Sequence, residues 1–273
     1  LLAISHYVFS NPEPGFGEYK AADRLEQFVV EHGFSTTRGS GVLATAIKGL
    51  HPVCDGPNIA FLSEYDALQI GHACGHNLIA ATGAGSAVAF DKTVRRFGLS
   101  ANAVFLGTPA EERGGGKIRM LDAGFFDDIA YAMMVHPADR TMVEDWSLAG
   151  QKLSISYYGR AAHCAASPWL GANALAAAEQ TISLVNAWRC QFKDYSRVNA
   201  IILKGGEATN VLPDYAEVQF NVRSDQRPYL DELVRIVINC AECAARAFGV
   251  AVKHELGLVF EPINNDKMLE RHM

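Results

Sequence analysis

The sequence predicts an α/β protein whose first half builds a mostly parallel sheet and whose second half builds a separate α+β domain. Three short apolar runs, at residues 59–62, 103–106 and 131–135, have the length and composition of fully buried strands in a parallel sheet. The pattern changes after Gly150, because residues 152–158 alternate polar and apolar side chains. Such alternation is typical of a strand with one solvated face.

The elements of the first half alternate between helix and strand. Residues 18–31 place apolar side chains on one face and are followed by Gly33, which predicts an amphipathic surface helix that ends there. Residues 42–64 predict two strands around a proline-bounded turn, and the small-residue run 80–89 predicts a tightly packed helix. We expect this alternation to continue as far as His136.

The second half predicts the order β-α-β-β-α-β, which is the ferredoxin-like arrangement. The expected elements are a strand at 152–158, a helix at 172–188, strands at 199–203 and 216–222, a helix at 230–248 and a strand at 251–256. A linker-like segment at residues 141–150 separates the two halves.

Composition narrows the class of protein. The chain has 273 residues and 49% hydrophobic residues, which is enough for a substantial core in one or two domains. The net charge of −6 argues against a nucleic-acid partner, and no apolar run reaches the roughly 20 residues that span a membrane. Small-molecule substrates are therefore favoured.

Cysteine usage bears on the compartment. Six cysteines in 273 residues are too few for a disulfide scaffold, so the sequence favours a reducing compartment and hence the cytoplasm. Because the chain begins at Leu1 rather than with methionine, an upstream targeting segment stays open as an expectation.

The first chemistry-bearing cluster is the glycine-flanked turn around Cys74 and His76. Gly75 between them lets the backbone bend sharply, so both side chains can face one point. Thiolate and imidazole are ligands that suit zinc and similar metals. A buried structural cysteine is the alternative for Cys74, and for His72 we expect a hydrogen-bonded loop histidine rather than a ligand.

The second cluster is the tandem pair Glu111 and Glu112, directly after the apolar run 103–106. Carboxylates buried there are costly unless a cation neutralises them. Adjacent side chains diverge, so one carboxylate can bind a metal while the other faces the attacking water. The alternative is a solvated acidic loop beside Arg113.

Three further residues follow the strand ends. His136 comes after the third apolar run, where a lone core histidine is the alternative to a ligand. We expect Glu64 to be a surface carboxylate, whereas Asp66 either hydrogen-bonds the ligand loop or lies at the surface. Three strand ends that carry Cys/His, Glu/Glu and His would bury polar groups together without a partner, so they jointly predict a metal site.

At these residues the sequence resembles the aminoacylase and carboxypeptidase-G class of metallopeptidases, in the amidohydrolase branch with indole-acetyl-amino-acid, hippurate and aminobenzoyl-glutamate hydrolases. Asn77, after the ligand loop, resembles the subgroup with a β-alanyl-lysine dipeptidase. The matching segments are residues 4–6, 11–13, 64–68, 71–77, 109–112, 159–163, 205–206, 209–213 and 264–265.

The resemblance implies a hydrolase that cleaves the amide of an N-acyl amino acid or small dipeptide through a metal-bound hydroxide. It implies two divalent metal ions, zinc foremost with manganese or cobalt as alternatives, and Glu111 as general base. The implied metal ligands are Cys74, His76, Glu112 and His136.

The resemblance also implies a catalytic domain at residues 1–147, an inserted lid and dimerisation domain at 148–262, and a return to the catalytic domain at 263–273. In a homodimer, His163 would stabilise the oxyanion in a neighbouring subunit's site, and Asn210 and Arg223 would hold the substrate. Without the resemblance these three would be a packed histidine, a turn residue and a surface charge.

One departure from the family motivates an alternative. Family members supply a last ligand histidine from a segment beyond residue 273, and we expect His272 to be a surface histidine rather than its replacement. The chain is therefore expected to be a fragment or a truncated product, and an inactive dimerisation or binding protein is the alternative function. Thiol chemistry at Cys74 is a third hypothesis, which explains neither Glu112 nor His136.

Overall fold

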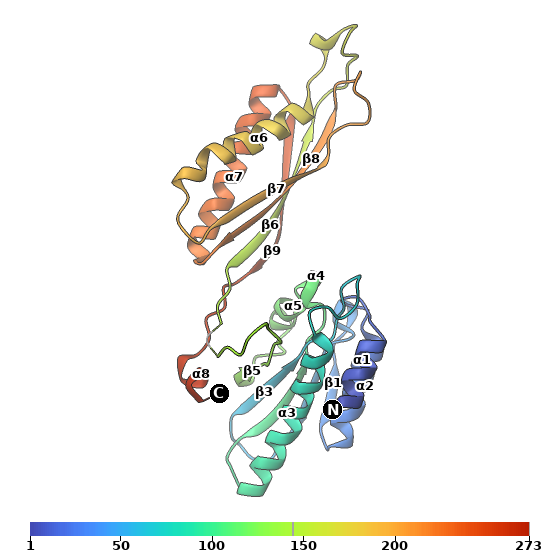
Figure 1. Ribbon diagram of the computed structural model, residues 1–273, viewed down its shortest axis with the longest axis vertical. Helices are drawn as coiled ribbons and strands as arrows, with labels where there is room; N and C mark the ends of the chain where they lie inside the picture. Colours follow the sequence, from blue (N-terminus) through green and yellow to red (C-terminus); the bar gives the residue numbers. More distant parts are fainter. Residues whose placement is uncertain (144, 273) are drawn as a thin grey trace. The chain divides into compact units, whose positions relative to one another are not determined.

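The protein forms two compact units, Leu1–Thr141 and Met142–Met273. The computed structural model describes residues 1–143 and 145–272 (Figure 1). The side chain of His272 lies outside the described part, so the expectation for that histidine is not addressed. The domain limits at residues 147 and 262 likewise stay predictions.

The first unit is built on a five-stranded sheet with the order β1-β2-β4-β3-β5. The strands are β1 (Ser35–Arg38), β2 (Ile47–His51), β3 (Asn58–Ser63), β4 (Asn102–Gly107) and β5 (Ile129–Met133). Strand β3 pairs in parallel with both β4 and β5, while β1 and β2 extend the sheet in antiparallel fashion. The three parallel strands therefore end at one edge.

Helices cover one face of this sheet and loops with a short helix cover the other. The elements are α1 (Leu2–Ser10), α2 (Tyr19–Glu31), η1 (Gly41–Leu43), α3 (His76–Phe97), α4 (Glu111–Gly114) and α5 (Gly116–Asp122). Ala103 and Phe105 of β4 pack toward α1, α2 and α3, whereas Val104 and Leu106 pack with Phe125 on the other face. Both faces of β4 are buried, which explains its continuous apolar run.

Two glycines allow the close approaches that bring the strand ends together. A Cβ on Gly83 of α3 would lie 2.3 Å from the carbonyl oxygen of Leu62, so only glycine lets α3 contact β3 this closely. Gly75 has a φ of 75°, and a Cβ there would lie 2.8 Å from Cγ of Pro137. The start of α3 is thereby held against the segment that follows His136.

The α/β fold class is confirmed. The helix predicted at residues 18–31, the two strands within 42–64 and the helix around 80–89 are all present. The expectation of a fully buried third strand was wrong, because β5 is an edge strand and Tyr131 is 48% exposed. Helix α1 and strand β1 were not predicted.

The second unit has the predicted order of elements. They are β6 (Ala149–Tyr158), η2 (Pro168–Leu170), α6 (Ala174–Trp188), η3 (Arg189–Gln191), β7 (Arg197–Lys204), β8 (Tyr215–Ser224), α7 (Arg227–Phe248), β9 (Ala251–Phe260) and α8 (Lys267–His272). The sheet has the order β7-β8-β6-β9 and is antiparallel throughout. This is the ferredoxin-like topology, with α6 and α7 on one face (Figure 1).

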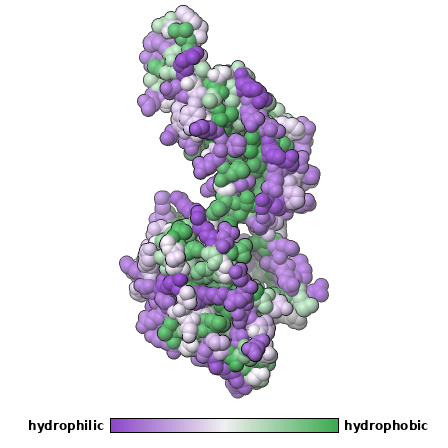
Figure 2. Space-filling model, turned by 180° about the vertical axis from the view of Figure 1, so that it is seen from behind, coloured by the Kyte–Doolittle hydropathy of each residue, from purple (hydrophilic) through white to green (hydrophobic). Residues whose placement is uncertain are grey.

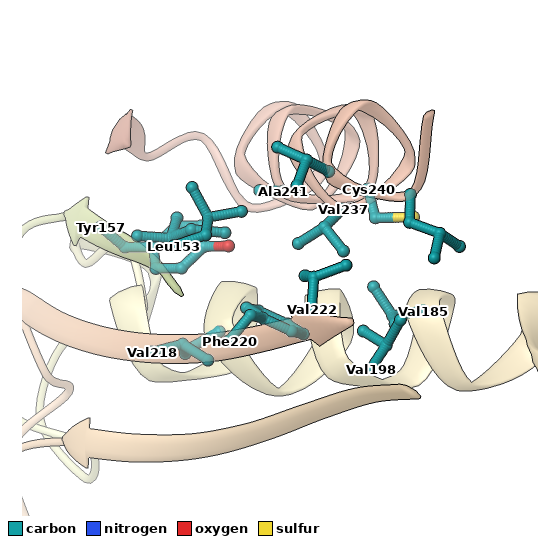
Figure 3. Packing of buried hydrophobic residues seen from close by; sticks show 14 of the residues in the cluster. Leu153, Tyr157, Val185, Val198, Val218, Phe220, Val222, Val237, Cys240 and Ala241 are labelled. Atoms are coloured by element: carbon teal, nitrogen blue, oxygen red, sulfur yellow. The ribbon is translucent and has the colours of Figure 1, made fainter. Parts of the chain in front are cut away.

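The core of this unit lies between the sheet and its two helices. Figure 3 shows Leu153 of β6 and Phe220 of β8 among the buried side chains between the sheet and α7, with Val185 of α6 and Val198 of β7 close together. The one hydroxyl among these labelled side chains, on Tyr157, is paired with Thr181 Oγ1 at 2.6 Å, and burial raises the pKa of Tyr157 to about 12. The alternation seen in the sequence thus separates a helix-facing side from an open side.

The second unit also exposes apolar side chains. A green band of hydrophobic residues runs along it in Figure 2. On the edge strand β7, Ile201 is 59% and Leu203 is 47% exposed, and on the other edge strand β9, Leu256 is 48% exposed. Among the described residues, no helix is both long and apolar enough to cross a membrane.

Replacing Phe220 with alanine is expected to destabilise the second unit by about 3–5 kcal/mol, because its fully buried ring would leave a cavity. The measurement is urea unfolding followed by circular dichroism. Lys152→Ala on the exposed side of β6 is the control, with an expected change within about 0.5 kcal/mol. Equal losses in the two variants would contradict the assigned core.

Candidate metal centre

The candidate site lies at the edge of the first unit where the three parallel strands end. Glu64 and Asp66 follow β3, Glu111 and Glu112 form the first turn of α4 after β4, and His136 follows β5. His76, the first residue of α3, completes the group. The prediction that these strand ends meet is confirmed by the distances between their side chains.

His76 is the centre of this cluster. It is 1% exposed, and its Nδ1 lies 2.9 Å from the carbonyl oxygen and 3.1 Å from Oδ1 of Asp66. Nδ1 therefore donates a proton to Asp66, and in the neutral ring the Nε2 lone pair is left for the site. Nε2 lies 3.3 Å from Oε2 of Glu64, 3.7 Å from Oε1 of Glu112 and 3.9 Å from Oε2 of Glu111.

The electrostatics of His76 reflect these neighbours. Burial lowers the pKa of His76, but the hydrogen bond to Asp66 and the charge of Glu64 raise it more, so the net shift is upward. In turn, burial raises the pKa of Asp66 while its bond to His76 and the amide of Glu112 lower it, with a net fall. The pair thus favours a charged Asp66 that holds the ring in place.

Glu64 corrects the sequence-based expectation of a surface carboxylate. It is 1% exposed, and its Oε2 faces Nε2 of His76 and, at 3.9 Å, Nε2 of His136. Its other oxygen accepts a hydrogen bond from Nζ of Lys117. Lys117 was not identified as a site residue from the sequence. Its position shortly after the tandem glutamates was the only signal in the sequence that it could contact the site.

The tandem glutamates diverge as expected. The Glu112 side chain is 18% exposed, and its backbone N–H donates to Oδ2 of Asp66 at 3.0 Å. The Glu111 side chain is 42% exposed. Burial raises the pKa of Glu111, and the charge of Glu64 adds to the rise. Glu112 is thus the better-held ligand candidate, whereas the raised pKa of Glu111 favours uptake of a proton.

His136 is more exposed, at 48% of its side chain, but it is oriented like His76. Its Nδ1 lies 2.8 Å from the carbonyl oxygen of Pro137, to which it donates a hydrogen bond. The Nε2 lone pair is again left for the site. A histidine whose second nitrogen is fixed by a backbone carbonyl or a carboxylate is the usual arrangement at metal centres.

Within the part of the chain that the structure describes, two groups of side chains could hold a metal ion. In the first, Glu64, His76 and His136 each place a ligand atom within 4.8 Å of the others, and in the second His76 joins Glu111 and Glu112. Glu64 Oε2 and His76 Nε2 are buried and make no hydrogen bond to any described residue. Buried polar atoms left without a hydrogen bond are expensive, so this donor set fits a divalent cation.

Cys74 is exposed and belongs to neither group. A hydrogen bond to the Glu112 carboxylate, with the nearby negative charges of Glu112 and Glu111, raises the pKa of Cys74 to about 11. A nucleophilic cysteine needs a lowered pKa, so this finding argues against thiol chemistry. The thiol nevertheless lies beside the ligand candidate Glu112.

His72 also lies outside both groups. It is 8% exposed, and burial lowers its pKa. Its two ring nitrogens make no hydrogen bond of normal geometry to the described residues, so the expected hydrogen-bonded loop histidine was wrong in that respect.

The three residues predicted in the second unit are all exposed, and two of them lie together. The backbone N–H of Cys164 donates to the carbonyl of Asn210 at 2.9 Å, which joins the loops of His163 and Asn210. Arg223 lies near the far end of β8, opposite Arg197 and Gly150. Strand β8 begins at Tyr215, five residues after Asn210. At a rise of about 3.3 Å per residue, Arg223 lies about 26 Å along the strand from Tyr215.

The ring of His163 has a defined orientation. Its Nδ1 accepts the backbone N–H groups of Ala165 and Ala166, both at 3.2 Å. In the neutral imidazole the proton is then on Nε2, which becomes a hydrogen-bond donor.

Comparisons with known proteins agree with these features. Residues 150–246 match the peptidase dimerisation domain. The chain is 39% identical over 267 residues to the Xaa-Arg dipeptidase of Homo sapiens, which covers 92% of this chain and 61% of that protein. It is 32% identical over 263 residues to a p-aminobenzoyl-glutamate hydrolase chain of Escherichia coli (strain K12), with 89% and 54% covered.

Among solved structures, the YXEP protein of Bacillus subtilis, described as a dinuclear metal binding peptidase from the M20 family, is similar in fold. Its TM-score is 0.75 at 22% identity, with 99% of this chain and 76% of that chain covered. The chain spans 61% of the length of the human dipeptidase and 54% of that of the bacterial hydrolase.

Replacing His76 with alanine is expected to weaken zinc binding by more than about 100-fold, because its Nε2 belongs to both ligand groups. Residues that only orient a ligand typically change metal affinity by about 10- to 100-fold. His72→Ala, in the same loop but in neither group, is the matched control. The measurement is zinc bound per chain after dialysis. The assignment fails if the two variants retain equal zinc.

Proposed function

Because the chain belongs to the M20 peptidase family, we propose that the protein is a metal-dependent amidohydrolase that cleaves the amide bond of an N-acyl amino acid or small dipeptide. The observation that carries the proposal is the buried Nε2 of His76, which faces three carboxylates and makes no hydrogen bond to a described residue. The human and bacterial relatives are both named as hydrolases, which disfavours the alternative that this chain is an inactive dimerisation or binding protein.

We propose two divalent ions, zinc foremost and manganese or cobalt as alternatives. His76 and Glu112 would hold them with His136 and Cys74, and Glu64 stands close enough to His136 to contribute. When bound, such ions polarise the substrate carbonyl and lower the pKa of water. Cys74 would lose its proton on binding, since metal thiolates form from the deprotonated thiol.

Proton transfer is assigned to Glu111. Its raised pKa suits a group that takes a proton from the attacking water and then gives it to the leaving amine. Its greater exposure than Glu112 lets it reach the substrate. In the proposed homodimer, the Nε2–H of His163 would stabilise the developing oxyanion in the neighbouring subunit's site, and Asn210 and Arg223 would help to hold the substrate.

Replacing Glu111 with alanine is expected to preserve bound zinc but lower kcat by about 10²–10⁴-fold, since general-base catalysis is lost. Hydrolysis is measured on N-acyl amino acids and β-alanyl dipeptides, and zinc is measured in parallel. Glu232→Ala, an exposed glutamate of α7, is the control. Native turnover by the Glu111 variant would assign the base to another group.

The proposed assembly is a homodimer formed through the second unit. Residues 150–246 match a dimerisation domain. Strand β7 lies at the edge of the sheet, where it pairs with β8 along one side, and it exposes Ile201 and Leu203. A long apolar edge strand is a template for pairing with another chain. We also propose a cytoplasmic location, because six cysteines are sparse for a disulfide-bonded secreted protein.

Replacing Ile201 with glutamate is expected to shift the protein from dimer toward monomer, because the charge would be desolvated at the strand edge. Sedimentation velocity gives the mass in solution. Leu121→Glu is a matched control, since Leu121 in the first unit is 60% exposed and Ile201 is 59% exposed. A monomeric native protein would refute the dimer, and an unchanged Ile201 variant would refute this edge.

A further inference from the structure

Glu18 is a fully buried carboxylate that the proposed chemistry does not use. It is 0% exposed and precedes α2. Its Oε1 accepts the backbone N–H of Ala110 at 2.8 Å, and its Oε2 accepts the hydroxyl of Thr45 at 2.9 Å. No lysine, arginine or histidine among the described residues forms an ion pair with it. Burying a carboxylate that has only neutral hydrogen-bond donors costs free energy, so we looked for a role that this arrangement serves.

The partner of Glu18 is a strained residue directly before the tandem glutamates. Ala110 has a φ of 56° and a ψ of 47°, in the left-handed region that alanine rarely adopts. Its carbonyl oxygen accepts the N–H groups of Gly114 and Gly116, at 3.2 and 3.1 Å. Both polar groups of this peptide unit are thus fixed, and the turn that starts α4 begins from a single conformation.

The residues around Glu18 also contact the backbone that follows β3. Thr45, the other partner of Glu18, accepts at its carbonyl a hydrogen bond from the hydroxyl of Tyr65, which lies between Glu64 and Asp66, at 2.6 Å. The carbonyl of Glu13 accepts the N–H of Ala67 at 2.8 Å. Residues 13–18, which we call the strap, therefore bind the backbone after both β3 and β4.

Steric contact reinforces these bonds. A Cβ on Gly15 would lie 2.9 Å from both Cα and Cβ of Ala110, so the strap packs directly against the strained residue. Phe16, also left-handed at a φ of 63°, places its ring where a Cβ on Gly114 would lie, 2.3 Å from Cε2. Strained residues persist only where their surroundings over-determine them.

We propose that Glu18 is a positioning residue that, through the backbone N–H of Ala110, sets the Glu111–Glu112 turn in the geometry that binds metal. The inference rests on the proposed function of that centre. Glu18 does not touch the metal or the substrate. Its removal releases Ala110 from the left-handed conformation and lets Glu112 drift from His76.

The test compares zinc affinity in two variants of nearly equal volume. Glu18→Gln keeps an oxygen acceptor for Ala110, while Glu18→Met removes it without a large cavity. We expect Glu18→Met to bind zinc about 10- to 100-fold more weakly, as for other residues that orient ligands, and Glu18→Gln to bind with native affinity. Affinity is measured by competition with a chromophoric chelator, and thermal melting of the metal-free proteins monitors the fold.

Two further variants separate positioning from general stability. Thr45→Val removes the bond to Oε2 but leaves the bond to Ala110, so it should lower the melting temperature and keep zinc affinity. Ala110→Gly in the Glu18→Met background should recover part of the affinity, because glycine adopts this φ without strain. A merely structural role would predict neither pattern.

Folded Glu18→Met with native zinc affinity would overturn the inference while leaving the proposed function intact. If the native protein binds no zinc, the proposed function fails and the inference with it. Should Glu18→Met not fold, Gly15→Ala decides, because its Cβ would lie 2.9 Å from Cα and Cβ of Ala110, too close to leave that residue in place, and only at ordinary contact distance, 3.6 Å, from Oδ2 of Asp66. We expect that variant to bind zinc more weakly, and native affinity in it would overturn the inference.

Discussion

The candidate metal centre of the first unit is constrained by four carboxylates that surround one buried imidazole. Glu64, Asp66, Glu111 and Glu112 all come within 4 Å of His76, and Lys117 supplies one nearby positive charge. Charges of like sign in a low-dielectric site repel strongly, so this cluster would be unstable unless cations or protons balanced it. The raised pKa values of His76 and Glu111 express that imbalance, and a divalent cation would remove it.

The backbone around the cluster adopts close contacts and left-handed conformations that do not themselves stabilise the fold. Gly75 takes the left-handed conformation against Pro137, and Gly83 lets α3 sit on the end of β3. Ala110 takes the left-handed conformation without being glycine, which is the costlier choice. Each of these features brings a site residue toward the same edge of the sheet. The strained backbone is thus tolerated because it lets the site side chains approach one another.

The sequence predicted those parts of the structure whose signal is local. The continuous apolar run of β4, the alternation in β6 and the tandem glutamates each report their own surroundings, and the structure agrees. Glu64 and Lys117 could not be assigned, because their burial depends on contacts 53 residues apart in the chain. The exposed edge strand β5 was misjudged because composition cannot distinguish an edge strand from a central one. For the resemblance-based residues His163, Asn210 and Arg223, the structure gives positions, and their roles stay proposals.

The two units differ in the chemistry that they can offer. The candidate metal centre of the first unit is rich in acceptors, since it gathers carboxylate oxygens and, in the neutral rings, the Nε2 lone pairs of His76 and His136. Hydrolysis of an amide also needs a donor for the oxygen that becomes negative. The proposed role of His163 fits that need, because two backbone N–H groups donate to its Nδ1, and in the neutral ring the proton is then on Nε2. A neutral donor suits this task better than a further cation, which would compete with the metal for the same carboxylates. The charge balance of the candidate centre is thus an argument for a neutral donor in the proposed mechanism.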